Sequence, residues 1–411
     1  MSKKKPHNPL PLTELRPEPL PYAVWGNGQI NAGAHDQMRA AMRLPVSVAG
    51  ALMPDAHVGY GLPIGGVLAT ENTVIPYAVG DDIACRMRIS LFEATPNLLA
   101  QHQGKFERAL VEETRFGAGA SFAPHERAEH PVMDDPDWEA TRQLAALKDK
   151  AYAQLGTSGS GNHFVEWGEL EILEEDATLG LQAGTYLALL SHSGSRGIGS
   201  SIANYYSEIA KSLHNLDKSV AQLGWLSLDS EVGQEYWLSM ELAGRFAAAT
   251  HEIIHRRVAK AAGVKALVSI ENHHNFAWKE PYVDETGELR EVIVHRKGAT
   301  PAGVGVLGII PGSMGDVGYI VRGKGVTSSL NSASHGAGRT MSRRQALSQI
   351  TKSDQKRYLK ESGVKLIGGG LDESPQAYKP IEAVIAAQTD LVDLIGKFTP
   401  RIVRMDGDLS T

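Results

Sequence analysis

The pattern of hydrophobic and polar positions changes period along the chain, and each change predicts a different element. Between residues 46 and 95, short apolar runs alternate with glycine turns, which is typical of strands. Apolar positions at three- and four-residue spacing predict helices instead, the longest over 235–262. The other predicted helices lie over 36–42, 97–113, 138–155, 200–213, 339–350 and 380–398, so that the C-terminal part is mostly helical.

Further strands are predicted between these helices. They lie over 186–190, 266–270, 291–295, 303–310 and 317–322. Residues 1–20 have an irregular pattern, and residues 117–137 and 214–233 have the polar composition of loops. No linker or internal repeat divides the chain. The mixed order of strands and helices therefore predicts an α+β fold in which residues 1–411 form a single domain.

Composition limits the class of protein. Hydrophobic residues make up 42% of the 411 residues, which is enough for a sizeable core. No apolar run approaches the ~20 residues that a transmembrane helix needs, and the N-terminus lacks the apolar segment of a signal peptide. One cysteine rules out a framework of intrachain disulfides. We therefore expect a cytoplasmic protein without a membrane partner.

The formal net charge of −6 means that any contact with nucleic acid depends on local positive charge. No G-x-G-x-x-G or Walker A segment follows a predicted strand, so these nucleotide sites are not supported. Basic residues beside glycine-rich motifs are the candidates for an RNA contact, with ordinary solvated charge as the alternative. They are Arg296 with Lys297, Arg322 with Lys324, and Arg339 with Arg343 and Arg344.

Candidate chemistry begins with a histidine in a run of small residues. His335 lies in Ser-His-Gly-Ala-Gly-Arg (334–339), so a large ligand can reach its imidazole and the nearby backbone N–H groups. Glycines allow backbone angles that turn N–H groups toward an anion, and the helix predicted from residue 339 would add a phosphate-binding N-terminus. His335 is therefore a candidate nucleophile toward phosphorus. The alternative is a tight turn with a half-buried histidine.

Metal-binding residue types recur in other glycine-rich loops that follow apolar runs. They include Asp55, Asp82, Cys85, His163, His192, His273 and His274. A solvated histidine needs no such setting, so the recurrence predicts one site assembled from distant loops. Oxygen, sulfur and nitrogen donors together suit Mn, Fe, Co or Zn. A single cysteine without C-x-x-C spacing favours a catalytic centre over a structural zinc site, with a small buried hydrophobe as the alternative for Cys85.

A second motif competes with this interpretation. Residues 251–255 have the sequence H-E-x-x-H, the signature of zinc proteases, within the predicted helix 235–262. At this spacing both imidazoles share one face of the helix. A zinc protease needs a third ligand downstream, and Glu271 is the nearest carboxylate. The alternative is two polar positions beside the apolar stripe of an amphipathic helix.

Taken in order, the motifs resemble the RtcB family of RNA ligases, the 3′-phosphate/5′-hydroxyl nucleic acid ligases, as a bacterial-type paralogue. The resemblance extends from about residue 53 to residue 378 and covers most of the chain. It rests on segments 80–85, 159–166, 192–197, 274–275, 295–300 and 311–315, and on the loop around His335. The resemblance implies stacked β-sheets flanked by helices, with a central cleft that contains metal.

The resemblance also implies roles for individual residues. His335 would attack the α-phosphorus of GTP and carry GMP, and Asp55 matches a carboxylate that the family needs near its metals. Two Mn²⁺ ions would be held by Asp82, Cys85, His163, His192 and His274, with Cys85 bridging. The nucleotide would be contacted by Asn162, Phe164, Glu166, Pro311, Ser313, Met314, Gly336, Ala337, Gly338 and Tyr378. Tyr378 is expected to stack on guanine.

Two positions depart from the family's pattern. The family usually ends in a lysine followed by glycine, and that lysine contacts the guanylate, whereas Asp406 precedes Gly407 here. Arg404 and Lys397 are the candidates to replace the missing cation. Arg86 follows Cys85 where glycine is common, and we expect this bulky cation to contact RNA phosphate or to alter access to the metals.

The resemblance and the residue types together predict an RNA ligase that depends on GTP and Mn²⁺. It would join RNA 3′-phosphate or 2′,3′-cyclic phosphate ends to 5′-hydroxyl ends through a guanylylated histidine. The alternative is a non-ligating relative that binds metal and RNA ends or hydrolyses the cyclic phosphate. The zinc protease is a weaker alternative.

Overall fold

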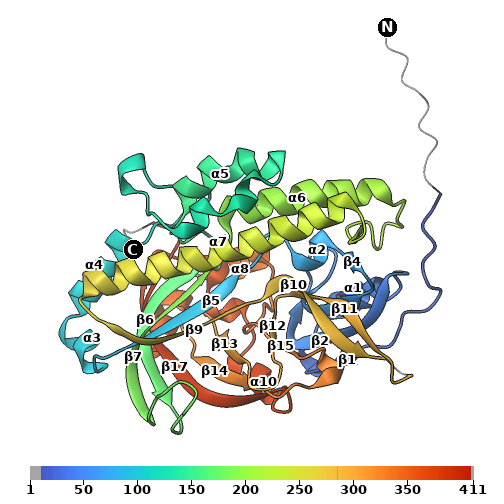
Figure 1. Ribbon diagram of the computed structural model, residues 1–411. Helices are drawn as coiled ribbons and strands as arrows, with labels where there is room; N and C mark the ends of the chain where they lie inside the picture. The colour runs from blue at the N-terminus through green and yellow to red at the C-terminus, as the bar shows by residue number, and fades with distance from the viewer. Residues whose placement is uncertain (1–10, 285, 409–411) are drawn as a thin grey trace.

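Two β-sheets lie at the centre of the computed structural model, and helices cover one side of them (Figure 1). The structure describes residues 11–284 and 286–408. The larger sheet has the order β13-β14-β17-β6-β7-β5-β9, with β16 pairing with β17. Its strands are β5 (Arg86–Phe92), β6 (Phe164–Ile172), β7 (Gly184–Ser193), β9 (Ala266–His273), β13 (Leu307–Pro311), β14 (Gly318–Gly323), β16 (Lys365–Ile367) and β17 (Val392–Met405).

The smaller sheet has five strands in the order β1-β2-β3-β11-β10. These strands are β1 (Ala23–Val24), β2 (Ser47–His57), β3 (Ile64–Thr70), β10 (Asn275–Val283) and β11 (Leu289–Lys297). Two short antiparallel pairs complete the β structure: β4 (Thr73–Val74) with β8 (Leu226–Ser227), and β12 (Ala299–Pro301) with β15 (Ser332–Ser334). The β12–β15 pair brings the chain to His335, directly after β15.

Helices α4 to α7 lie on one side of the sheets, above them in Figure 1. The helices are α1 (Ala32–Ala41), α2 (Pro76–Val79), α3 (Asn97–Gln101), α4 (Gln103–Glu113), α5 (Arg142–Gln154), α6 (Arg196–Leu213), α7 (Glu231–Ala262), α8 (Arg343–Gln349), α9 (Lys352–Glu361) and α10 (Ile381–Ala386). The mixed α+β fold predicted from the sequence is confirmed. Among the described residues, no helix is long and apolar enough to cross a bilayer.

The long helix α7 shows why these layers stay together. Its N-terminus is capped by Ser230, whose Oγ accepts from the Gly233 N–H at 3.2 Å, and it ends at Gly263 in the left-handed conformation (φ 68°). Ile254 and Val258 pack with Trp167 of β6 in one buried cluster. The predicted helix 235–262 is confirmed with an earlier start, and it supports the sheet behind the candidate site.

The C-terminal region corrects the prediction. A helix was expected over 380–398, but α10 spans only Ile381–Ala386 and the chain then forms the fourteen-residue strand β17 (Val392–Met405) in the larger sheet. Burial alternates strictly from Gly396 to Ile402, so the pattern has the period of a strand. The apolar residues were assigned the wrong period, because neighbouring strands on both edges of β17 decide its structure.

The helix predicted over 339–350 begins only at Arg343 and has seven residues. Arg339 forms a β-bridge with Tyr378 instead, and Ser342 begins the helix through a capping box with Gln345. His335 therefore lies well before the helix, and the expected helix N-terminus beside it is not present. At the N-terminus, residues 1–10 of the predicted irregular segment lie outside the described residues, and residues 11–20 contain only an isolated bridge at Leu12.

Candidate active site

The predicted metal ligands converge where neighbouring strands of the larger sheet end. Asp82 and Cys85 lie in the turn before β5, and His163 directly precedes β6. His192 lies near the end of β7, opposite Phe164 of β6, and His274 follows β9. Because β6, β7, β5 and β9 are adjacent in the sheet, five residues distant in sequence reach one place.

Their ligand atoms point toward one another. Cys85 Sγ lies 3.1 Å from His192 Nε2 and 3.5 Å from His163 Nε2. His192 Nε2 lies 3.3 Å from His274 Nε2, and His163 Nε2 lies 3.1 Å from Asp82 Oδ2. Ligand atoms of Cys85, His163 and His192 all fall within 4.8 Å of one another, and these three residues are buried. This donor set of sulfur, nitrogen and oxygen fits a borderline divalent metal.

The protonation states favour the imidazole ligands, whereas the Cys85 thiol has to lose its proton when a metal binds. Burial lowers the pKa of His192 and His274 well below the usual value, so both rings are neutral and keep a lone pair. Burial, followed by the Asp82 charge, raises the pKa of the Cys85 thiol well above its usual value. The His192 Nδ1–H donates to the Asn162 carbonyl at 3.2 Å, which leaves Nε2 for a ligand. The buried Nδ1 of His274 has no hydrogen-bond partner among the described residues.

His335 is fixed by Asp55 from the other sheet. Asp55 Oδ2 accepts from His335 Nδ1 at 2.7 Å, from its backbone N–H at 3.1 Å and from the Gly336 N–H at 3.3 Å. Burial would raise the pKa of Asp55, but the hydrogen bond and charge of His335, together with Lys379, outweigh it and lower that pKa. Nδ1 therefore carries the hydrogen, and Nε2 keeps the lone pair of a nucleophile.

The loop after His335 allows this contact because of a glycine. Gly338 has φ 74°, and an added Cβ would lie 2.0 Å from the Asp55 carbonyl oxygen. On the other side, Lys379 Nζ donates to the carbonyls of Pro54 and Ala56 at 2.8 and 2.9 Å, which holds the backbone on both sides of Asp55. The carboxylate and the His335 loop are therefore positioned together.

A cavity of about 890 Å³ lies above this arrangement. Of the predicted residues it is lined by Asp82, Asn162, His163, Phe164, His192, Pro311, Ser313, Met314, His335, Gly336, Ala337, Gly338 and Tyr378. Asp55, Cys85, His274 and Glu166 are not among the lining residues. Glu166 lies two positions beyond Phe164 on the same face of β6, and burial raises its pKa well above the usual value.

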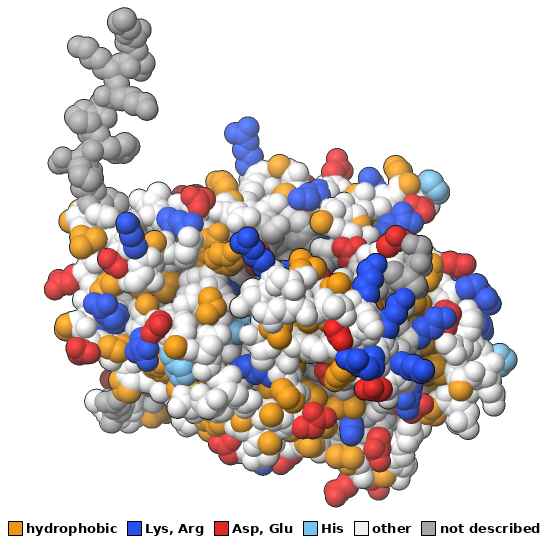
Figure 2. All heavy atoms as spheres, turned by 180° about the vertical axis from the view of Figure 1, so that it is seen from behind, with side chains coloured by type: hydrophobic (Ala, Val, Ile, Leu, Met, Phe, Trp, Pro, Cys, Tyr) orange, Lys and Arg blue, Asp and Glu red, His pale blue; other side chains and the backbone are white. Residues whose placement is uncertain are grey.

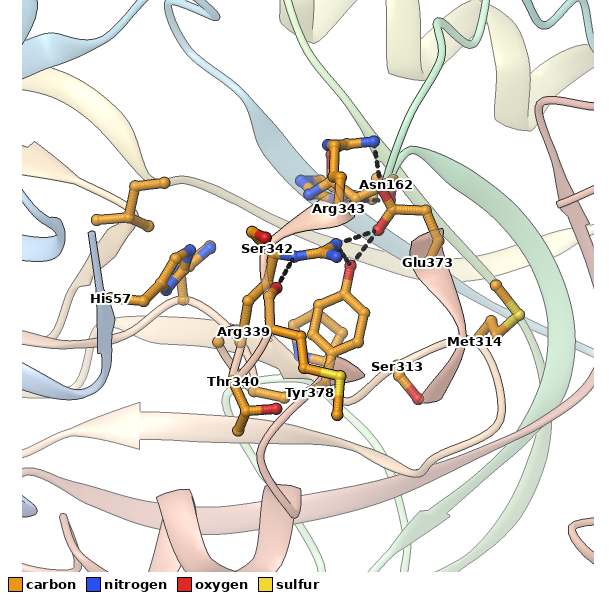
Figure 3. A pocket seen from close by; sticks show the side chains of 18 of the residues that line it. His57, Asn162, Ser313, Met314, Arg339, Thr340, Ser342, Arg343, Glu373 and Tyr378 are labelled. Atoms are coloured by element: carbon orange, nitrogen blue, oxygen red, sulfur yellow. Dashed lines mark hydrogen bonds and ion pairs between the residues drawn. The ribbon is translucent and has the colours of Figure 1, made fainter. Parts of the chain in front are cut away.

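One wall of the cavity is a charged network that sequence reasoning found only in part (Figure 3). Arg339 Nη1 lies 2.9 Å from Glu373 Oε2 and 3.1 Å from the Tyr378 hydroxyl. Its guanidinium lies 5.1 Å from the centroid of the Tyr378 ring, and Tyr378 also donates to Glu373. Arg343 pairs with Glu373 as well. Glu373 was missed because it and the neighbouring Asp372 lie outside any recognisable motif.

The other basic candidates do not line the cavity. Arg296 is fully buried and pairs with Glu280 at 2.6 Å, and Lys297 is buried as well. Arg322 pairs with Asp176, and Lys324 with Asp393. Of the predicted basic residues only Arg339, Arg343 and Arg344 line the cavity. In Figure 2, Lys and Arg side chains gather on the right half of the face, with Asp and Glu among them, so positive charge is local.

Arg86 does not face the cavity as expected. Its guanidinium is buried and lies 3.2 Å from both Glu271 Oε1 and His273 Nδ1. Glu271 also pairs with Arg88 at 3.0 Å. The expected contact of Arg86 with RNA is therefore wrong, because β5 turns this side chain toward β9. Glu271 is also unavailable as the third ligand of a zinc protease.

The expected replacement of the C-terminal lysine is wrong too. Arg404 is buried, donates to the backbone carbonyls of Ile367 and Met405, and lies 4.9 Å above the Phe116 ring. Neither Arg404 nor Lys397 lines the cavity, whereas Met405 does. The Asp406 carbonyl accepts from Gly369 at 2.9 Å. The cations at the cavity are the arginines from the segment after His335.

The H-E-x-x-H motif forms a buried hydrogen-bonded chain instead of a zinc site. His251 Nε2 lies 3.1 Å from the Ser193 carbonyl, and its Nδ1 lies 2.7 Å from Ser191 Oγ. Ser191 Oγ lies 2.8 Å from His255 Nε2, and Ser90 Oγ lies 2.7 Å from His255 Nδ1. Because the Ser193 carbonyl only accepts, His251 donates from Nε2 and accepts at Nδ1 from Ser191. The Ser191 hydroxyl in turn accepts from His255 Nε2, and Ser90 donates to His255 Nδ1. The two histidines thus join α7 to β5 and β7.

Comparison with known proteins agrees with this geometry. The family model described as tRNA-splicing ligase RtcB matches residues 37–406. The RNA-splicing ligase RtcB of Escherichia coli K12 is 32% identical, with 93% of this chain and 96% of that relative covered. The corresponding tRNA-splicing ligase of Methanococcus maripaludis is 31% identical over 81% and 82% of the two chains. The RNA-splicing ligase RtcB of Mycobacterium tuberculosis is 31% identical over 85% and 94%.

Proposed function

Because this chain belongs to the RtcB family and is an RNA ligase, we propose that it joins RNA 3′-phosphate or 2′,3′-cyclic phosphate ends to 5′-hydroxyl ends with GTP and two Mn²⁺ ions. The observation that carries the proposal is the hydrogen bond of 2.7 Å between Asp55 Oδ2 and His335 Nδ1. It leaves Nε2 as the nucleophilic nitrogen of a histidine that lines a large cavity beside a Cys/His cluster.

In the first proposed step, the lone pair on His335 Nε2 attacks the α-phosphorus of GTP. The bond from this phosphorus to the oxygen of the β-phosphate breaks, pyrophosphate leaves with the electron pair, and GMP is joined to His335 by an N–P bond. Asp55 holds the reactive tautomer and stabilises the positive charge that develops on the imidazole. No additional base is needed, because the attacking nitrogen carries no proton.

In the next steps, an oxygen of the RNA 3′-phosphate attacks the same phosphorus, and the N–P bond breaks with its electrons returning to Nε2. The 5′-hydroxyl oxygen of the second RNA end then attacks the activated 3′-phosphate. GMP leaves, the hydroxyl proton is released, and a phosphodiester bond joins the two ends. His335 is regenerated, so the cycle requires one GTP for each joined pair.

The residues present fit the two proposed metal ions. Asp82, Cys85, His163, His192 and His274 would hold them, and the neutral rings of His192 and His274 support this assignment. Bound Mn²⁺ would neutralise phosphate charge and orient the in-line attack. Cys85 would supply the thiolate of this donor set, because its Sγ faces two imidazoles at 3.1 and 3.5 Å.

The proposed guanylate position lies along the wall of Tyr378, Ser313 and Met314. One face of the Tyr378 ring is covered by Arg339, so a guanine would stack on the other face. Arg343 and Arg344 line the cavity and would supply the positive charge that the family's lysine provides. Glu373 holds Arg339 and Arg343 in position.

Ligation of a defined RNA pair tests the proposal. One strand carries a 3′-phosphate and the other a 5′-hydroxyl, and the reaction is run with GTP and Mn²⁺, with either one omitted, and with ATP in place of GTP. We expect joined product only when GTP and Mn²⁺ are both present. In a parallel reaction the first strand carries a 2′,3′-cyclic phosphate, and opening of this end to a 3′-phosphate without joining would favour the non-ligating alternative. Joining without GTP would contradict the proposed chemistry.

A further inference from the structure

An exposed tyrosine lies at the rim of the cavity, and the proposed function does not use it. Tyr60 is 79% exposed and follows β2 in the loop that leads to β3. Tyr60 lines the cavity together with Asn31, His57, Val58 and Ile64. In Figure 3, His57 lies on the opposite side of the cavity from Ser313 and Met314. The loop that contains Tyr60 therefore leaves β2 on the side away from the proposed guanylate wall.

The backbone that carries Tyr60 is firmly held, although its side chain is exposed. The buried Lys297 donates to the Tyr60 carbonyl and, at 3.0 Å, to the Tyr77 carbonyl. Next to it, the Gly59 N–H donates to Gln37 Oε1 of α1 at 3.0 Å, and Gln37 donates back to the Gly59 carbonyl. Because the backbone is fixed and a tyrosine side chain has only two torsions, little conformational entropy is lost when a ligand binds to its ring.

The cavity is large enough for a second occupant on this side. Ligand pockets begin at roughly 300 Å³, whereas this cavity measures about 890 Å³. Ile64 on this side lies close to the proposed nucleophile, since a Cβ added at Gly298 would meet both Ile64 Cγ2, at 2.3 Å, and His335 Cε1, at 3.1 Å. A group bound here is therefore adjacent to the proposed reaction centre.

We propose that Tyr60 is a stacking platform for the nucleobase at the end of an RNA strand that enters the site. Every nucleobase has a π-face, so an aromatic ring binds an RNA end without selecting its sequence. The proposal rests on the proposed function, because the RNA end has to reach His335. The base can belong to the 3′-phosphate strand or to the 5′-hydroxyl strand, and both present the same ring chemistry.

Ligation kinetics of Tyr60→Ala and Tyr60→Phe test this platform, with Tyr205→Ala as the matched control. Tyr205 is also exposed, at 49%, but it lies on α6 and does not line the cavity. Rates are normalised to the guanylylated fraction of each sample, measured by mass spectrometry. We expect Tyr60→Ala to raise KM for RNA about five- to hundredfold, whereas Tyr60→Phe and Tyr205→Ala stay within about twofold of the parent protein.

A strand lacking its terminal base identifies the contact. When the strand that stacks on Tyr60 has an abasic end, the parent protein and Tyr60→Ala should have the same KM for RNA. When only the other strand has an abasic end, the difference in KM between the two proteins should remain. The strand on which the difference disappears is the one that Tyr60 holds. If Tyr60→Ala becomes guanylylated and has the same KM for RNA as the parent protein, this inference alone is overturned. A raised KM in Tyr60→Ala that persists when both RNA ends are abasic would also overturn it. Absence of any GMP adduct in the parent protein would instead overturn the proposed function.

Discussion

Asp55 Oδ2 accepts a hydrogen bond of 2.7 Å from Nδ1 of His335, although the two residues are 280 positions apart in the chain. The carboxylate is fully buried, and the backbone on both sides of it is held by Lys379. This contact selects which imidazole nitrogen faces the cavity. The proposed nucleophile therefore depends on an aspartate from the other sheet.

Replacing Asp55 with Asn tests this dependence. The amide keeps the size of the side chain but offers the imidazole either a donor or a weaker acceptor, so the reactive tautomer loses its preference. We expect guanylylation to slow by about 10²- to 10⁴-fold, while bound metal stays at the level of the parent protein. The rate of GMP incorporation and metal content, measured on the same samples, check the prediction. An unchanged rate would show that Asp55 only supports the fold.

The Cys/His cluster makes a separate prediction about metal. Cys85→Ala removes the one thiolate of a one-cysteine chain, and no described residue is placed to replace a sulfur facing His163 and His192. We expect the variant to lose at least one of two Mn²⁺ ions, measured by mass spectrometry of the metal after dialysis. Full retention of both ions would rule out a bridging role for Cys85.

His251→Ala is the matched comparison, because His251 hydrogen-bonds to Ser191 and Ser193 and not to the cluster. The substitution leaves a buried hydroxyl and a buried carbonyl with one partner fewer. We expect a loss of about 1–3 kcal/mol in the free energy of unfolding with both metal ions retained. Loss of metal in His251→Ala, with metal retained in Cys85→Ala, would restore the zinc-protease interpretation of the H-E-x-x-H motif.

Much of the site was predictable because its residues lie in short motifs beside strands with clear patterns. His192 lies near the end of β7 and His274 follows β9, and both apolar strands were placed within a few residues of their observed ends. The environment of other residues depended on partners that the local pattern does not reveal. Arg86 is directed by Glu271 from β9, and Glu373 lies at the cavity because of its pairing with Arg339. For the same reason β17 was mistaken for a helix, since its two neighbouring strands determine its structure.

The C-terminal departure from the family gives a prediction of small effect. Asp406 does not line the cavity, and the cations that do are Arg339, Arg343 and Arg344. We therefore expect Asp406→Lys to change GTP affinity by less than about fivefold. Arg343→Ala should weaken GTP binding by about tenfold or more, the loss typical of a charged hydrogen bond. Equilibrium binding of GTP to both variants decides, and a tenfold gain in Asp406→Lys would show a deficit left by the missing lysine.

Buried histidines make the stability of the metal-free protein depend on pH. His295 is fully buried, accepts from the Ile75 N–H at 2.9 Å and lies 3.0 Å from the Leu68 carbonyl, and burial lowers its pKa to about 4. In the unfolded chain its pKa is about 6.5. Below pH 6.5 the unfolded state binds a proton that the folded state does not. The contribution of neutral His295 to the free energy of unfolding is therefore complete above pH 6.5. It is lost as the pH falls toward 4, by about 1.4 kcal/mol per pH unit.

Urea unfolding between pH 8 and pH 5 measures this slope. His295→Gln should be less stable at pH 8, because two buried hydrogen bonds are disturbed, but its stability should fall less steeply below pH 6.5. The slope of the free energy of unfolding against pH should correspond to up to one proton fewer taken up on unfolding than in the parent protein. Equal slopes for the two proteins would mean that His295 titrates alike in the folded and unfolded states.

Peptide mapping by mass spectrometry after incubation with GTP and Mn²⁺ tests whether His335 carries the covalent GMP. The parent protein should gain the mass of one guanylyl group on the peptide that contains His335, and the adduct should be labile to acid, as expected for an N–P bond. His335→Ala should retain its fold and metal but form no adduct. An adduct that persists in His335→Ala, or that maps to a lysine, would contradict the account.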